Sequence, residues 1–389
     1  MLNFTYYIPT VIHFGCGQVS HLTELTQSGK KVLMVYGGGS IKRSGLYDRA
    51  IAILKSAGLE VFELGGVEPN PKIQSVYAGV EICKANNIDM VLAVGGGSSI
   101  DCAKVIAAGA LYDGDAWDLV TNGSLIKGAL PIYTVLTLAA TGSEMDAGAV
   151  ISNDAIFEKI VTHSPFMLPK MSIMDPEYTF TVSPRQTSAG TADMMSHTLE
   201  NYFTDVPGAV IQARLAEAIL KTCIENGPKA LANPKDYDAR ANLMWAGSLA
   251  INGLIKLGAP IPWNVHPIEH ELSVFYGATH GEGLAILTPP WMKLVLEKDP
   301  SKAAAFATYA RNVWGVVEDD DDVAAKIAID KTAEFFFETM KMPANLRAIG
   351  VEDKSKFEIM AEKASKNVAG GGFVQLYKED IIHLFDLAF

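Results

Sequence analysis

Two patterns of hydrophobic and polar residues divide the chain. Over residues 1–183, short apolar runs alternate with amphipathic stretches, and glycine-rich turns lie at several junctions. This alternation is typical of α/β domains, in which parallel strands are buried on both faces. Four runs are predicted to be strands of a parallel sheet: 32–36, 60–64, 90–94 and 132–136. Three later runs predict further strands, with some antiparallel pairing: 147–152, 159–163 and 171–175.

The pattern changes after Ser183 and Pro184. From there to Phe389, apolar residues recur with the 3.6-residue period of amphipathic helices. A length of 389 residues suits two domains, and we expect an α/β domain over 1–183 and an all-helical domain over 184–389. Nine helices are predicted in the second domain: 185–204, 208–226, 236–255, 267–276, 283–296, 299–313, 322–340, 353–367 and 377–387.

The composition excludes several classes of protein. Hydrophobic residues make up 49% of the chain, but no uninterrupted apolar run is long enough to span a membrane. The first residues show no secretion signal, so we expect a soluble, cytoplasmic protein. A net charge of −12 disfavours nucleic acid as a partner. The four cysteines form no CxxC pair, which argues against a thiolate zinc site and a disulfide framework.

Glycine-rich loops follow two of the predicted strands. The loop 95–98 (GGGS) lies between a strand and a helix, an arrangement that directs backbone N–H groups and the helix dipole at an anion such as a pyrophosphate. A tight turn without a ligand would also explain one such loop. A second GGGS at 37–40 and a polar loop at 137–148 favour a dinucleotide that lies along one end of the sheet.

These loops differ from the ordinary Rossmann fingerprint. The GxGxxG pattern is absent, and no carboxylate stands in the first glycine loop or beside Lys42 and Arg43 to bind a ribose 2′-hydroxyl. Lys42 and Arg43 instead follow Gly39 and Ser40. This combination suits a 2′-phosphate, although two solvated charges would give the same pattern. We therefore expect NADP(H) to be preferred over NAD(H).

One carboxylate and four imidazoles are concentrated in two segments of the second half. Asp193 and His197 are spaced i, i+4 and share one face of a predicted helix. His266, His270 and His280 follow within fifteen residues. An aspartate with three histidines and no thiolate suits Fe(II) or Zn(II) better than Mg or Ca.

The residue after the first of these three histidines is a proline. Pro267 disfavours the α conformation at His266, so we expect His266 to project from the helix cap and His270 from the helix itself. Spacing alone does not identify which downstream histidine is not a ligand, and that histidine would be free to act as a proton relay. The other histidines are interpreted as packed or surface residues: His13, His21, His163 and His383.

Together these motifs resemble the iron-containing (group III) alcohol dehydrogenase family, in its NADP-dependent butanol dehydrogenase and aldehyde reductase branch. The resemblance spans nearly the whole chain. It implies a dehydroquinate synthase-like fold, in which an α/β dinucleotide-binding domain precedes a helical metal-binding and substrate domain, with the metal in the cleft. It is carried by GGGSSIDCAK at 95–104, TGSE at 141–144, DP at 175–176, GTADMMSHTLE at 190–200 and HPIEHELSVFYGATHG at 266–281.

The resemblance also implies roles for individual residues. The metal ligands would be Asp193, His197, His266 and His280, which leaves His270 as the catalytic residue near the nicotinamide and the substrate. The cofactor-binding residues would be Gly38, Gly39, Ser40, Gly96, Gly97, Ser98, Asp101, Thr137, Thr141, Ser143, Lys159, Tyr178 and Thr181.

The activity that this resemblance implies is interconversion of primary alcohols and aldehydes by hydride transfer with NADP(H). Butanol and butyraldehyde represent the expected short-chain aliphatic substrates, and we expect a homodimer with no membrane partner. An apolar pocket wall is predicted near the ligands, from Trp263, Phe203, Leu254 and Met244.

Other functions fit the sequence less well. The same family contains NAD-preferring alcohol and diol dehydrogenases, which are the first alternative. A dehydroquinate synthase-like lyase would need a cluster of basic residues, whereas residues 240–285 offer only Arg240 and Lys256. A non-catalytic nucleotide- or metal-binding protein would bind cofactor without turnover, and a metal hydrolase would use the Asp/His site without a nucleotide.

Overall fold

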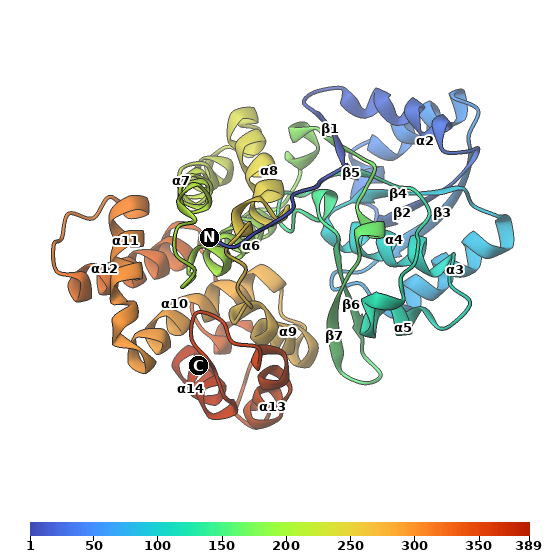
Figure 1. Cartoon of the computed structure of the whole chain (residues 1–389). Coiled ribbons are helices and arrows are strands. Elements are labelled where there is room, and N and C mark those ends of the chain that lie inside the picture. Colours follow the sequence, from blue (N-terminus) through green and yellow to red (C-terminus); the bar gives the residue numbers. More distant parts are fainter. The chain divides into compact units, whose positions relative to one another are not determined.

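The computed structural model describes residues 1–389, which form two compact units (Figure 1). The first, the α/β unit, consists of Tyr7–Val182 and Pro234–Ser248. The second, the helical unit, consists of Met1–Tyr6, Ser183–Asn233 and Leu249–Phe389. None of the helices combines the length and the hydrophobicity that crossing a bilayer requires.

A six-stranded sheet forms the centre of the α/β unit, and every pair of neighbouring strands in it is parallel. The strand order is β1-β8-β5-β4-β2-β3. The strands of this sheet are β1 (Val11–Phe14), β2 (Lys31–Gly37), β3 (Glu60–Val67), β4 (Met90–Gly95), β5 (Ile132–Leu136) and β8 (Met171–Met174). Two further strands, β6 (Gly148–Asn153) and β7 (Glu158–His163), form an antiparallel pair.

Side chains of the central strands alternate between the two faces of this sheet. On β4, Val91 and Ala93 belong to one buried cluster, whereas Met90, Leu92 and Val94 belong to another. Both faces are therefore covered, and β4 is fully buried. This is why the strand reads in the sequence as a continuous apolar run rather than an alternating one.

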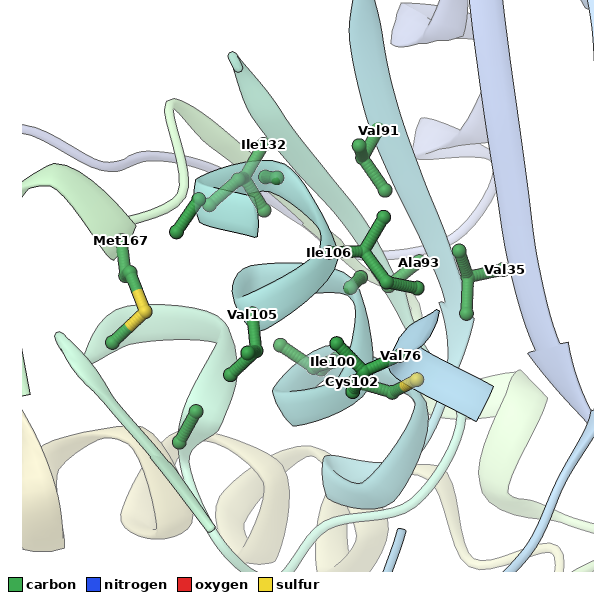
Figure 2. Close-up of a cluster of buried hydrophobic side chains, with 14 of the residues drawn as sticks. Val35, Val76, Val91, Ala93, Ile100, Cys102, Val105, Ile106, Ile132 and Met167 are labelled. Atoms are coloured by element: carbon green, nitrogen blue, oxygen red, sulfur yellow. The ribbon is translucent and has the colours of Figure 1, made fainter. Parts of the chain in front are cut away.

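Helices cover each face of the sheet. Figure 2 shows the first cluster, in which Val91 and Ala93 lie near Ile106 of a covering helix. The helices on that face are α3 (Ile73–Asn86), α4 (Gly97–Gly109) and α5 (Ala116–Thr121). The elements on the opposite face are the 3-10 helix η1 (Gln18–Gln27) and helices α1 (Ser40–Arg43) and α2 (Leu46–Ser56).

The predicted strands are confirmed, and one strand was missed. The runs 32–36, 60–64, 90–94 and 132–136 correspond to β2, β3, β4 and β5, and the three later runs correspond to β6, β7 and β8. The sequence patterns do not predict β1, because it has only four residues and none of them is fully buried. It is an edge strand that pairs with β8 alone.

All nine helices predicted in the second half are present, with ends displaced by a few residues. Residues 234–248, which include most of the third of these helices, cluster with the α/β unit. The helices are α6 (Pro184–Tyr202), α7 (Val210–Ala232), α8 (Tyr237–Ile251), α9 (Val265–Tyr276), α10 (His280–Lys298), α11 (Ala303–Trp314), α12 (Asp321–Glu334), α13 (Phe357–Val368) and α14 (Lys378–Ala388).

A buried polar network ties the loop after β5 to helix α4. The Lys104 ammonium donates to Oγ of Ser143 at 2.8 Å and to Oδ1 of Asp146 at 2.5 Å. Oδ1 of Asp101 accepts from Oγ of Ser143 at 2.6 Å, and its Oδ2 accepts from the backbone N–H of Val150 at 2.9 Å. Buried polar groups are tolerated when they are paired in this way, so the network fixes the loop against the helix.

Glu144 lies in the same loop but has no cationic partner within hydrogen-bonding distance. Its Oε1 accepts from Oγ of Ser248 at 2.5 Å, whereas its Oε2 is buried and makes no hydrogen bond. Burial raises the pKa of Glu144 to about 7, and the Ser248 hydrogen bond opposes the rise only in part. The carboxyl group is therefore protonated in the folded protein over much of the weakly acidic range.

We predict that Glu144→Gln changes how stability depends on pH. Between pH 4.5 and about 7, the folded wild type holds a proton that the unfolded chain has lost, so its free energy of unfolding falls as the pH rises. Glutamine carries no such proton. The free energy of unfolding of the variant, relative to the wild type, should therefore increase over this window by about 3 kcal/mol. Urea titrations at a series of pH values measure this difference, and a constant difference would contradict the prediction.

Candidate metal centre

Helix α6 carries the first two predicted ligands. Asp193 and His197 lie one turn apart and are buried, and Nε2 of His197 is 3.4 Å from Oδ1 of Asp193. The start of the helix is fixed locally. The Ser183 hydroxyl accepts from the backbone N–H of Gln186, and Pro184 occupies the first helical position. The i, i+4 spacing seen in the sequence thus becomes a pair of donors on one helical face.

Helices α9 and α10 bring two further imidazoles to the same carboxylate oxygen. Nε2 of His266 and Nε2 of His280 each lie 3.8 Å from Oδ1 of Asp193. The ring of His266 stacks on that of His197, with 4.6 Å between centroids. Gly277 ends α9 in the left-handed region (φ 65°), so the chain can turn and begin α10 at His280. Imidazoles from three helices therefore surround one oxygen atom.

The prediction that His266 projects from the cap of the helix is wrong. The N-cap is Asn264, so His266 and Pro267 both lie in the first turn of α9. The missing N–H of a proline costs no hydrogen bond there, because first-turn N–H groups have no partner within the helix. The backbone N–H of His266 donates instead to Oε1 of Glu200 at 2.8 Å. The prediction that His270 belongs to the helix is confirmed.

The ligand atoms of Asp193, His266 and His280 all lie within 4.8 Å of one another and fit a single divalent metal ion, and Nε2 of His197 lies 3.4 Å from Asp193. Oδ1 of Asp193 and Nε2 of His266 are buried and make no hydrogen bond, a costly state for polar atoms unless a ligand engages them. In a tetrahedral site with bonds of about 2.1 Å, donor atoms stand roughly 3.4 Å apart. The separations of 3.4–3.8 Å around Asp193 are close to this value. The donor set of one carboxylate with imidazoles suits a borderline ion such as Fe(II).

Two buried glutamates hold the rings of the downstream ligands. Oε1 of Glu200 lies 2.9 Å from Nδ1 of His266, and its Oε2 accepts from the backbone N–H of Asn264 at 2.7 Å. The Glu269 carboxylate is in short contact with Nδ1 of His280 and also accepts from the Ser273 hydroxyl. Each glutamate therefore keeps a proton on Nδ1 and directs Nε2 of the ring at the site of the metal.

Sequence reasoning missed both glutamates. Each stands three residues after a ligand in a His-x-x-Glu pair, Glu200 after His197 and Glu269 after His266. Such a pair is the signal that could have drawn attention to them. In the structure, however, each glutamate orients a different histidine from the one that precedes it. That pairing depends on how the helices pack, which the spacing does not reveal.

The protonation states of the ligands follow from burial and mutual attraction. Burial raises the pKa of Asp193, but the surrounding imidazoles outweigh burial and hold this pKa below its ordinary value. Burial lowers the pKa of His197 to about 3. Burial also opposes a charge on His266, yet the carboxylates of Asp193 and Glu200 raise its pKa to about 9. Asp193 and His197 are thus ready to bind a cation, whereas His266 must release a proton as the metal binds.

Two glycines allow the start of α10 to approach its neighbours. A Cβ atom at Gly281 would lie 2.0 Å from the carbonyl oxygen of Ala189 in α6. A Cβ atom at Gly283 would lie 2.7 Å from Cγ of Glu269. Neither distance is sterically possible without movement of the neighbour. The sequence HGEG at 280–283 therefore seats His280 against both α6 and its orienting glutamate.

His270 and Trp263 lie beside the ligands. The ring of His270 is 5.7 Å from that of His280, and the ring of Trp263 is 4.6 Å from that of His266. Trp263 thus presents apolar surface next to the metal centre, and its place in a pocket wall stays a prediction. Phe203, also predicted for that wall, is 2% exposed and packs against Phe306 at 4.6 Å between centroids. Phe203 therefore belongs to the core of the helical unit.

The predicted cofactor loops leave the same edge of the sheet. β5, β4 and β2 are parallel neighbours, so the loops that follow them are adjacent at their carboxyl ends. Gly96 is the N-cap of α4, and Gly39 is the N-cap of α1. The strand order reverses between β4 and β2, with β3 continuing outward from β2. Open α/β sheets bind ligands at such a reversal.

The predicted cofactor residues differ in their surroundings. A Cβ atom at Gly97 would lie 2.4 Å from Oγ1 of Thr141, so only glycine allows this approach of the two loops. Four of the predicted cofactor residues are buried: Gly97, Asp101, Ser143 and Lys159. The others are partly or fully accessible: Gly38, Gly39, Ser40, Gly96, Ser98, Thr137, Thr141, Tyr178 and Thr181. Asp101 and Ser143 are engaged in the Lys104 network. Contact of these residues with a cofactor stays a prediction.

Known proteins match this chain over nearly its whole length. Residues 9–176 match the family described as iron-containing alcohol dehydrogenase, and residues 187–389 match the C-terminal part of the Fe-containing alcohol dehydrogenase family. NADH-dependent butanol dehydrogenase A of Clostridium acetobutylicum is 52% identical over 389 residues, 99% of each chain. NADPH-dependent aldehyde reductase YqhD of Escherichia coli is 43% identical over 358 residues, 91% of each chain.

A solved structure matches over the same extent. The crystal structure of NADH-dependent butanol dehydrogenase A from Thermotoga maritima has a TM-score of 0.94 and 38% sequence identity to this chain. The match covers 100% of this chain and 99% of that one. Both units of the fold are therefore shared with this solved structure.

We predict that Glu200→Gln and Glu269→Gln each weaken metal binding by about 10- to 100-fold, because each removes the carboxylate that orients a ligand ring. The affinity is measured by competition with a chromophoric chelator. Glu217→Gln is the matched control, since Glu217 is also a buried carboxylate of the helical unit but accepts from Tyr202, Arg214 and Asn312. An equal loss of affinity in all three variants would contradict the orienting role.

Proposed function

Because the chain belongs to the iron-containing alcohol dehydrogenase family, we propose that it interconverts primary alcohols and aldehydes by hydride transfer with a nicotinamide cofactor. The observation that carries this proposal is the single oxygen of Asp193 surrounded by three imidazole nitrogens at 3.4–3.8 Å. The expected substrates are short aliphatic molecules such as butanol and butyraldehyde. The apolar ring of Trp263 beside the ligands supports this size and polarity.

We assign the parts of the reaction to two domains. Residues 1–183 would bind the dinucleotide through the loops after β2, β4 and β5, and residues 184–389 would bind the metal and the substrate. The metal ligands would be Asp193, His197, His266 and His280. The family name and the nitrogen-rich donor set both favour Fe(II).

Each residue of the metal centre has a defined task in this proposal. When bound, the metal supplies Lewis-acid polarisation of the aldehyde oxygen, and the reduced nicotinamide supplies the hydride. The Asp193 carboxylate would offset part of the charge of the ion, and the three imidazoles would complete its set of four protein donors. Glu200 and Glu269 hold the Nδ1 protons of His266 and His280, so these rings keep one orientation throughout turnover.

The cofactor preference that we propose is NADP(H). Residues 38–43 include no acidic side chain that would repel a 2′-phosphate, and they do include Lys42 and Arg43. The Lys42 ammonium lies 4.7 Å from the ring centroid of Tyr47, on the edge of this loop. NAD(H) is the second candidate, because the relatives differ in the cofactor that their names give. The butanol dehydrogenase of C. acetobutylicum is named as NADH-dependent, whereas the reductase of E. coli is named as NADPH-dependent.

Aldehyde reduction by the reloaded protein is the direct test of this function. Protein stripped of metal should not oxidise NADPH in the presence of butyraldehyde, and reloading with Fe(II) should restore the decrease in absorbance. A higher kcat/KM with NADPH than with NADH is expected. The reverse order would reject the NADP(H) preference alone, whereas no turnover with either cofactor after reloading would reject the proposed activity.

His270 is the proposed proton donor to the product oxygen, through water or a ribose hydroxyl. It lies one turn after His266 on α9 and next to the ring of His280. His270→Ala should lower kcat by about 100-fold, the lower end of the range for acid–base catalysis, and should flatten the pH profile. The metal content should not change. His383→Ala, in an exposed His–Glu pair of α14, is the control. Full turnover of His270→Ala across the pH range would reject the relay.

A further inference from the structure

A second cluster of metal-binding side chains lies in the α/β unit, outside the site already described. It consists of His13 on β1 and of His21 and Glu24 on η1. In the 3-10 helix, residues three apart eclipse one another, so His21 and Glu24 project from one face. Ile12 packs against the cluster on the other face of the sheet. His13, the next residue, therefore points to the face that η1 covers.

The three side chains meet at a single carboxylate oxygen. Oε1 of Glu24 is 2.5 Å from Nδ1 of His21 and 3.5 Å from Nε2 of His13. The ligand atoms of all three residues lie within 4.8 Å of one another. The two imidazole rings stack with 3.6 Å between centroids and 11° between planes. Two nitrogens and one oxygen from two separate elements therefore converge on one point.

Hydrogen bonding explains only part of this arrangement. The contact between Glu24 and His21 is a short hydrogen bond, which gives each of these two side chains a partner. His13 is different, because its Nε2 atom is buried and makes no hydrogen bond. A buried nitrogen aimed at a carboxylate and a second imidazole, without a hydrogen bond of its own, is the state that a shared cation would satisfy.

We propose that His13, His21 and Glu24 form a second divalent metal site of the Zn(II) class. Two imidazoles and a carboxylate are one of the common zinc donor sets, and a water completes the tetrahedron. The 3.5 Å separation between His13 and Glu24 already matches the roughly 3.4 Å expected of tetrahedral donors, and the His21 contact has to lengthen. The rings reach a shared ion by rotation about χ2, which is a soft torsion.

The site is open to the ion and shares no residue with the centre at Asp193. The side chains of His21 and Glu24 are 36% and 40% exposed, so an ion can enter from solvent. Donors of this kind bind Zn(II) more tightly than Fe(II) in the usual order of affinities. A bound ion would tie β1, an edge strand held by β8 alone, to η1. The proposed role of the site is to hold β1 against η1, and this role does not depend on the proposed activity.

Zinc stoichiometry tests the proposal. Full-length protein is stripped of metal and dialysed against micromolar free Zn(II), and zinc per chain is measured by mass spectrometry of the digested protein. The wild type should bind two ions per chain. Asp193→Ala is combined throughout with His266→Ala, because three imidazoles alone can still bind zinc. This background lacks the first centre and should bind one ion, and the same background with His21→Asn should bind none. If the background binds no zinc, or if the background with His21→Asn still binds one ion, the proposal is wrong.

Matched variants separate this site from general effects. His383→Asn removes a histidine from an exposed His–Glu pair that has no third donor, and in the Asp193→Ala background it should leave one zinc bound. Glu24→Gln should raise the Kd for Zn(II) at least tenfold without unfolding the chain, as circular dichroism verifies. After loading with Fe(II), His21→Asn alone should retain the full aldehyde reductase activity of the wild type. A failure of the proposed activity can therefore be told apart from a failure of the proposed zinc site. Zinc should raise the Tm of the Asp193→Ala background, which also carries His266→Ala, but not the Tm of that background with His21→Asn, and equal shifts would overturn the proposal.

Discussion

The carboxylate oxygen Oδ1 of Asp193 is the constraint on which the metal centre depends. It is buried, makes no hydrogen bond and faces imidazole nitrogens at 3.4–3.8 Å. A buried anion in such a setting is stable only beside a cation, and the imidazoles supply attraction without the full neutralisation that a metal provides. Several contacts direct those nitrogens at this one oxygen. Glu200 and Glu269 orient the rings of His266 and His280, and Gly281 allows the start of α10 to approach α6 closely.

The α/β unit is proposed to meet a different requirement, the binding of a long anionic ligand by backbone N–H groups. Its central strands are buried on both faces, so their polar ends and the loops beyond them are the parts available to a ligand. Adjacent glycine loops after β2 and β4 place N–H groups at the reversal of strand order. The Lys104 network holds the third loop, after β5, against α4. A negatively charged protein can in this way bind an anion without a basic patch.

The sequence predicted what depends on short-range pattern. Buried strands such as β4, the nine helices of the second half and the i, i+4 pair of Asp193 and His197 follow from local periodicity, and all are present. The contacts it missed join residues on different helices or strands: Glu200 with His266, Glu269 with His280, and His13 with His21. β1 was too short to give a pattern. The prediction that His266 lies at the helix cap is wrong because a proline is tolerated throughout the first turn of a helix. The rule that a residue before a proline avoids the α conformation does not take this into account.

Anomalous diffraction from crystals of the Fe(II)-loaded protein, recorded on both sides of the iron absorption edge, tests the central claim most directly. The account predicts an iron peak at about 2.0–2.2 Å from Oδ1 of Asp193 and from Nε2 of His197, His266 and His280. Glu269, His270 and His280 also bring ligand atoms within 4.8 Å of one another. An iron peak at that group, or no peak near Asp193, would contradict the account.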